Sequence, residues 1–325
     1  MRLSGVAKQG YTVLYGKSQM RQLGVVVPIV TPCTLEGQVD IEGLKMVCDD
    51  MIQAGCHGVF VLGSTGRGPW FGCEDRVKIC RTVANVIDTD TPLLAGCMSF
   101  GLDGMIENAK MMADSGAAIA VATAPMYFRY AGKELETIFL KFADASPLSV
   151  IIYDIPDLTG MALDPKLLMK LATHGNIDGF KDSSANYDNF KQLLDTLNTE
   201  APDFYLMQGK EYLLKDSLFA GASGLVVSLL HVNPQLFVGL YNAVQANDTE
   251  KADHLQQAIT EIMECIKSCF AKQSATSTLF HFLNTALNAR GINVNIRLEH
   301  EGRCPDWIAA KARQALEISK NDSVE

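Results

Sequence analysis

Residues 149–184 read SVIIYDIPDLTGMALDPKLLMKLATHGNIDGFKDSS, and this stretch holds one repeat of the pattern that decides the fold. Short apolar runs begin at Ser149 and Ile177, and each has the length of a buried strand. Between them, Asp164 before Pro165 is typical of a helix N-cap followed by proline at the first helical position. A strand, a helix and a second strand in this order indicate a βα unit of a parallel sheet.

The same alternation extends along the chain in both directions. Eight apolar runs occur, and they begin near Gly24, Gly58, Pro92, Ile119, Ser149, Ile177, Phe204 and Gly224. Successive starts lie roughly 20 to 34 residues apart, which suits one strand, one helix and two short loops. Asn233 before Pro234 marks a further helix start. Eight units predict an α/β fold of the closed (β/α)₈ TIM-barrel type, whereas an open doubly wound sheet, which usually has fewer strands, is the alternative.

The chain outside the eight units has a different pattern. Residues 249–290 and 305–319 look wholly helical, and the first residues show no clear periodicity. We therefore expect an N-terminal extension over 1–20, a catalytic barrel over 21–246 and a C-terminal helical region over 247–325.

Composition and charge exclude several classes of function. The formal net charge is -9, so the chain offers no electrostatic reason to approach nucleic acid or an anionic membrane. No apolar run reaches the ~20 residues that a membrane-spanning helix needs. The first twenty residues lack the apolar core of a secretory signal, so a cytoplasmic location is expected.

The cysteines do not form a recognisable metal or disulfide motif. The chain has nine of them, an odd number, and no C-x-x-C pair. Cys265 and Cys269 lie four apart and could share one face of a helix, but a second pair of ligands is missing. We expect reduced thiols and no metal site.

Polar residues that follow the apolar runs are the candidates for chemistry, because active sites of such barrels lie at the carboxyl ends of the strands. Lys181 ends the sixth run, where an amine can act as a nucleophile toward carbonyls. Pairing with Asp182 for structure alone is the alternative. Tyr153 ends the fifth run, where its phenol could relay a proton or could simply pack.

Two further strand endings carry possible binding groups. The second run ends in Gly63-Ser64-Thr65-Gly66, whose amides and hydroxyls could cradle a carboxylate or could form a plain tight turn. Its spacing fits neither a dinucleotide-binding loop nor a phosphate-binding loop. Tyr127 and Arg129 follow the fourth run and could serve the site or an interface.

Taken together, these endings resemble the dihydrodipicolinate synthase/N-acetylneuraminate lyase family of pyruvate-dependent class I aldolases, from about Gly24 to Val244. In that family a G-[ST]-T-G loop binds the pyruvyl carboxylate, which implies this role for Gly63, Ser64 and Thr65. The resemblance also implies that Tyr153, in the family's Y-x-x-P motif, is the proton-transfer residue. It implies that Lys181 is the Schiff-base lysine and that Tyr127 is the tyrosine that reaches across a subunit interface.

Several positions depart from the family pattern. Dihydrodipicolinate synthases carry a carboxylate-binding arginine where this chain has Leu158. Arg67, followed by Gly-Pro, stands where many members have glutamate and is similar to some 2-keto-3-deoxy sugar acid aldolases. Asp154 replaces a common asparagine, and Met126 a common tyrosine.

The resemblance implies a Schiff-base lyase that makes or breaks a C–C bond between pyruvate and an aldehyde, without metal or organic cofactor. The substrate expected from Leu158 and the Gly-Pro continuation is a 2-keto-3-deoxy sugar acid or a related hydroxy-2-oxo acid. Gly209, Glu211 and Ser228 are expected to face the substrate tail. Family members are commonly homotetramers built as dimers of dimers.

Alternatives remain within and outside this class of enzyme. The first set is 4-hydroxy-tetrahydrodipicolinate synthase activity, N-acetylneuraminate lyase activity, or a dehydratase that acts on the same imine. A catalytically dead barrel that binds a 2-oxo acid or a partner protein is the alternative that is not an enzyme, although it would gain little from a lysine in this position.

Overall fold

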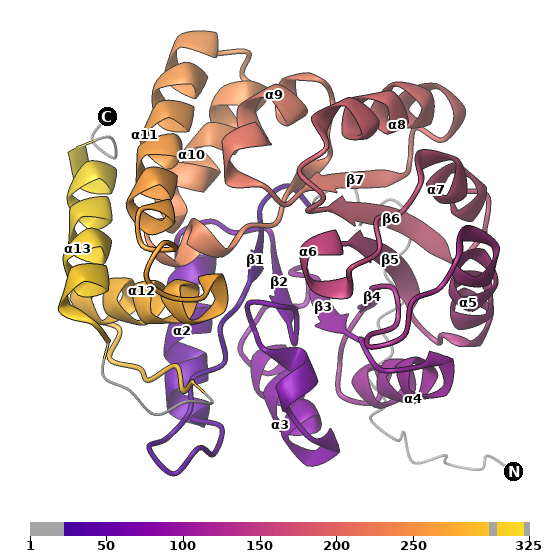
Figure 1. The fold of residues 1–325 in the computed structure, drawn as a ribbon, viewed down its shortest axis with the longest axis horizontal. Coiled ribbons are helices and arrows are strands. Elements are labelled where there is room, and N and C mark those ends of the chain that lie inside the picture. The colour runs from indigo at the N-terminus through magenta and orange to yellow at the C-terminus, as the bar shows by residue number, and fades with distance from the viewer. Residues whose placement is uncertain (1–22, 299–303, 322–325) are drawn as a thin grey trace, which may run out of the picture.

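The computed structural model describes residues 23–298 and 304–321, and its centre is a barrel of eight parallel strands in sequence order (Figure 1). The strands are β1 (Val26–Pro28), β2 (Gly58–Val61), β3 (Leu93–Gly96), β4 (Ile119–Ala122), β5 (Ser149–Asp154), β6 (Ile177–Asp182), β7 (Tyr205–Gln208) and β8 (Gly224–Leu225). Each strand begins within two residues of its expected start. The predicted barrel is therefore confirmed, and the alternative, an open doubly wound sheet, is wrong.

The barrel closes between its first and last strands. Val25 pairs with Leu225 in parallel, and the Leu225 amide donates to the Gly24 carbonyl at 2.8 Å. A β-carbon on Gly224 would lie 2.0 Å from the same carbonyl oxygen. The close approach of the two backbones therefore requires glycine at this point.

Helices cover the outside of the barrel. They are α2 (Ile41–Gln53), α3 (Cys73–Ala84), α4 (Leu102–Ala113), α5 (Gly132–Ala145), α7 (Pro165–Leu171), α8 (Tyr187–Glu200), α9 (Leu214–Phe219) and α10 (Pro234–Gln245). The short helix α6 (Pro156–Thr159) and the 3₁₀ turns η1 (Gly68–Trp70), η2 (Glu211–Leu213) and η3 (Ser228–His231) lie instead at the carboxyl end of the barrel. The strands are apolar on both faces because one face packs inside the barrel and the other against the outer helices.

The two expected helix starts differ in detail. The Asp164 carboxylate accepts a hydrogen bond from the Lys166 amide at 2.7 Å, as an N-cap should. Asn233 occupies the N-cap of α10, but its side chain accepts no capping hydrogen bond. Its side-chain nitrogen Nδ2 donates instead to the Ser319 carbonyl at 3.1 Å, because α13 (Asp306–Asn321) packs nearby and offers an acceptor.

The C-terminal part is helical but not continuous over 249–290. It consists of α11 (Thr249–Lys267), α12 (Ala275–Ala289) and α13 (Asp306–Asn321), which pack on one another and on α10 (Figure 1). The break over 268–274 contains no glycine or proline. The next helix, α12, begins after Ser274, which is its N-cap and whose hydroxyl accepts a hydrogen bond from the Ser277 amide.

Other expectations concern termini and thiols. The expected extension over 1–20 lies outside the described residues. All nine cysteines are free thiols, and no three potential metal ligands gather within residues 23–298 and 304–321. None of the described helices combines the length and apolarity that crossing a membrane requires.

Candidate active site

A cavity of about 600 Å³ opens at the carboxyl ends of the strands. Strand ends and the loops after them form one side, and the C-terminal helices α11 and α12 form part of the other. Of the nine predicted site residues, seven line this cavity: Ser64, Thr65, Tyr153, Lys181, Gly209, Glu211 and Ser228.

Lys181 and Tyr153 meet inside this cavity. They are register partners on β6 and β5, so both side chains point into the barrel. The Lys181 ammonium nitrogen lies 4.0 Å from the centre of the Tyr153 ring and 5.3 Å from that of Phe60. Lys181 is only 5% exposed, and no described carboxylate lies within ion-pair distance of it.

Asp182 is not the partner of Lys181, because neighbouring residues of a strand point to opposite faces. Its carboxylate accepts from the Ser184 amide at 2.5 Å. On β5, Asp154 likewise faces outward, and both of its oxygens accept from the Leu163 amide at 3.3 Å. Burial, together with the nearby Asp182 carboxylate, raises the pKa of Asp154 to about 7.

The loop after β2 is a tight turn that also reaches the cavity. The Gly68 amide donates to the Gly63 carbonyl at 3.0 Å, and the Thr31 hydroxyl donates to the Gly66 carbonyl at 2.8 Å. Ser64 and Thr65 line the cavity. Gly63 does not line it and packs against the Phe60 ring, from which a β-carbon at this position would lie only 2.6 Å away.

Arg67 lines the cavity but directs its guanidinium to the protein itself. Its terminal nitrogens donate to the carbonyls of Thr31, at 2.6 Å, and of Arg297. The rings of Trp70 and Phe280 lie 5.2 and 5.7 Å from it. Arg67 therefore ties the loop after β2 to the C-terminal region and is not free to hold a substrate carboxylate.

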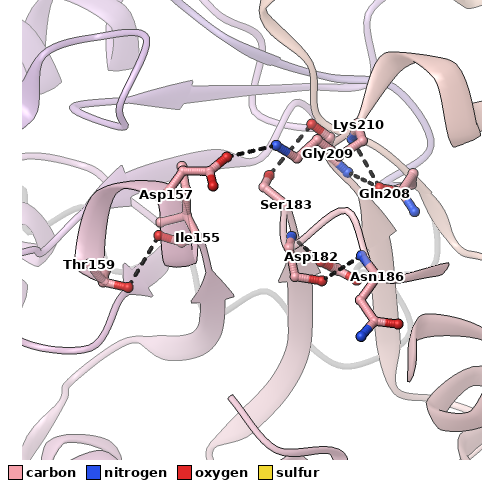
Figure 2. Close-up of polar contacts among 10 residues, drawn as sticks. Ile155, Asp157, Thr159, Asp182, Ser183, Asn186, Gln208, Gly209 and Lys210 are labelled. Atoms are coloured by element: carbon pink, nitrogen blue, oxygen red, sulfur yellow. Dashed lines mark hydrogen bonds and ion pairs between the residues drawn. The ribbon is translucent and has the colours of Figure 1, made fainter. Parts of the chain in front are cut away.

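Of the residues expected at the substrate tail, Gly209 and Glu211 follow β7, and Ser228 begins η3 after β8. The Gln208 side-chain oxygen accepts from the amides of Gly209 and Lys210, both at 2.9 Å, and fixes this turn (Figure 2). The Ser228 hydroxyl donates to the Glu211 carboxylate at 3.3 Å. Burial raises the pKa of Glu211.

A salt bridge crosses the rim of the cavity. The Lys210 ammonium lies 3.1 Å from the Asp157 carboxylate on α6, and both residues line the cavity (Figure 2). Leu158 follows Asp157 on α6, lines the cavity and is 62% exposed.

His231 supports the site and was missed from the sequence. It is fully buried, and burial lowers its pKa to about 4. Its Nε2 accepts from the Val30 amide at 3.2 Å, so its Nδ1 carries the proton and donates to the Ser228 carbonyl at 2.8 Å. No local signal marks it, because the Val30 amide lies on a segment far away in the sequence.

Tyr127 is the one predicted catalytic residue that this chain does not bring to the cavity. It is 82% exposed and has a positive φ of 80°. Its ring contacts that of Phe128, with centres 4.9 Å apart. Arg129 is exposed and lies against Gly160 rather than in the cavity.

Comparisons with known proteins agree with this geometry. The model of the dihydrodipicolinate synthetase family matches residues 21–299. The chain belongs to this family. It is a lyase of the pyruvate-dependent class I type, which confirms the resemblance read from the motifs.

Relatives within the family carry more than one activity in their names. YagE of Escherichia coli K12, provisionally named a 2-dehydro-3-deoxy-D-gluconate aldolase, is 31% identical over 74% of this chain and 80% of its own. A 4-hydroxy-tetrahydrodipicolinate synthase of Methanoculleus marisnigri is 28% identical over 75% of this chain and 83% of its own. The crystal structure of YagE with pyruvate superposes with a TM-score of 0.85 at 27% identity, covering 92% of this chain and 98% of that one.

Proposed function

We propose that Lys181 is the Schiff-base nucleophile of an aldolase that cleaves a hydroxy-2-oxo acid to pyruvate and an aldehyde. One observation carries the assignment: a buried amine faces the cavity, has no described carboxylate partner and lies against a phenol ring. An amine so placed is available to attack a carbonyl carbon.

The reaction follows from the groups around that amine. The Lys181 amine adds to the C2 carbonyl to give a carbinolamine, which takes up one proton and loses water, and the resulting protonated imine is an electron sink. The C3–C4 bond then breaks, its electrons enter the imine to give an enamine, and the C4 hydroxyl loses its proton as the aldehyde departs. Protonation at C3 and addition of water release pyruvate and the free amine.

Two sets of residues assist these steps. Tyr153 lies beside the amine and is placed to carry the protons between substrate oxygen and solvent. Ser64 and Thr65 supply hydroxyls and amides for the carboxylate. Glu211 and Ser228 then face the carbons beyond C4 and can bind hydroxyl groups there.

The proposed substrate is a 2-keto-3-deoxy sugar acid or a related hydroxy-2-oxo acid. Two relatives from Escherichia coli K12, YagE and YjhH, are provisionally named as aldolases of such acids. Leu158 supports the choice, because it faces the cavity and cannot bind the carboxylate of aspartate semialdehyde.

We also propose a cytoplasmic homotetramer in which Tyr127 reaches the site of a neighbouring copy. Its support is the exposure of the Tyr127 ring beside Phe128, since a large aromatic pair in water favours contact with another surface.

The test is a panel of hydroxy-2-oxo acids, including keto-deoxy sugar acids and sialic acid, with pyruvate and aldehyde both measured. The proposal expects equal amounts of the two products and no turnover by Lys181→Ala, while the surface variant Lys166→Ala stays active. Loss of water from the substrate without release of pyruvate would identify a dehydratase instead.

A further inference from the structure

The side of the cavity that lies farthest from the strands of the barrel is apolar. It consists of Trp70, Met263, Ile266, Phe270, Leu279 and Phe280, which we call the outer wall. Trp70 and Phe270 are each 41% exposed although they are large and apolar. Exposed aromatic side chains that line a cavity continuous with an active site are typical of a ligand-binding surface.

The polar groups near the outer wall are already engaged. The guanidinium of Arg67 donates to backbone carbonyls and lies between aromatic rings. The Lys267 ammonium lies 3.0 Å from the Glu264 carboxylate and over the Tyr212 ring. Thr276 adds one hydroxyl. Hydroxyl groups of a ligand would lose water here with few partners to replace it, whereas methylene groups or a ring would gain by burial.

The size of the cavity fits more than a short substrate. Its volume of about 600 Å³ lies within the range of roughly 300–1,000 Å³ that is usual for sites of drug-sized ligands. Pyruvate bound to Lys181 would fill the part of the cavity inside the barrel, together with the hydroxyl-bearing carbons of the substrate beside Glu211 and Ser228. The outer wall would then remain for the distal end of the substrate.

We propose that the outer wall binds an alkyl or aryl tail on the aldehyde half of the substrate, so that the enzyme also joins pyruvate to aldehydes with long apolar chains. This inference rests on the proposed aldolase function. In that reaction C3 of the Lys181 enamine attacks the aldehyde carbon, the C3–C4 bond forms, and the aldehyde oxygen takes a proton to become the C4 hydroxyl. Water then hydrolyses the imine and frees the lysine.

The experiment measures kcat/KM for condensation of pyruvate with acetaldehyde, butanal, hexanal and 3-phenylpropanal. Each methylene that reaches the outer wall should raise kcat/KM about threefold to fourfold. Phe270→Asp should lower the ratio of the hexanal to the acetaldehyde value at least about tenfold. Phe219→Asp is the matched control, because Phe219 is 39% exposed and lies outside the cavity.

The outcomes separate the two proposals. A flat or falling series with the wild-type enzyme, or an unchanged ratio in Phe270→Asp, would overturn the role of the outer wall while acetaldehyde turnover upholds the aldolase. Absence of condensation with every aldehyde and absence of a pyruvate imine would overturn the aldolase itself. The wild-type series decides the question even where Phe270→Asp does not fold.

Discussion

The ammonium nitrogen of Lys181 lies 4.0 Å from the centre of the Tyr153 ring on the neighbouring strand. The two residues are register partners, so the barrel itself fixes their separation. A nucleophilic amine and a phenol that can move protons are thereby held together without any loop having to close.

The first prediction concerns Tyr153→Phe, which keeps the ring and removes the hydroxyl. Turnover should fall by the ~10²–10⁴-fold that is typical of a lost general acid/base, while pyruvate still forms some imine. Steady-state kinetics and trapping of the imine measure the two effects separately. Near-normal turnover would show that Tyr153 only packs against Lys181.

Leu158 should set the discrimination against aspartate semialdehyde. A charge-assisted contact contributes about 1.5–3 kcal/mol, so Leu158→Arg should raise kcat/KM for this aldehyde roughly tenfold to hundredfold. Leu158→Met is the control of similar volume and should leave it unchanged. If the wild-type enzyme already preferred aspartate semialdehyde over the other aldehydes, the argument from Leu158 would be wrong.

Asp154 should make the fold less stable as the pH rises. Its pKa is raised from 3.8 to about 7, so the folded chain keeps a proton that the unfolded chain releases between these values. Stability is therefore lost as the pH rises through this window, by about 1.4 kcal/mol for each pH unit at most. Asparagine cannot ionise and can still accept from the Leu163 amide.

Asp154→Asn should accordingly raise Tm, and the gain at pH 8 should exceed the gain at pH 5 by about 2 °C or more. Thermal melts at both pH values measure it. Asp90→Asn, at an exposed position, should shift Tm equally at the two values. Equal gains for Asp154→Asn would show that its carboxyl is ionised in the folded chain throughout this range.

The sequence predicts the barrel well because its strands are buried on both faces and read as continuous apolar runs. It does not predict the break after Lys267, since 268–274 contains no glycine or proline and the N-cap serine, Ser274, is a weak signal by itself. It places Lys181 and Tyr153 on one rim, because parallel strands end at the same edge.

Other parts of the site depend on contacts between distant segments. Arg67 donates to the Arg297 carbonyl, 230 positions later, and His231 accepts from the Val30 amide, 201 positions earlier. A single sequence gives no periodic or local signal for such pairs. Tyr127 is a different case, because its proposed partner is a second copy of the chain.

The most direct test of the account is reduction with borohydride in the presence of pyruvate, followed by peptide mass analysis. We expect irreversible loss of activity and one reduced pyruvate adduct on Lys181, with no adduct when pyruvate is omitted or when Lys181→Ala is used. An enzyme that retained its activity with Lys181 unmodified would contradict the Schiff-base mechanism.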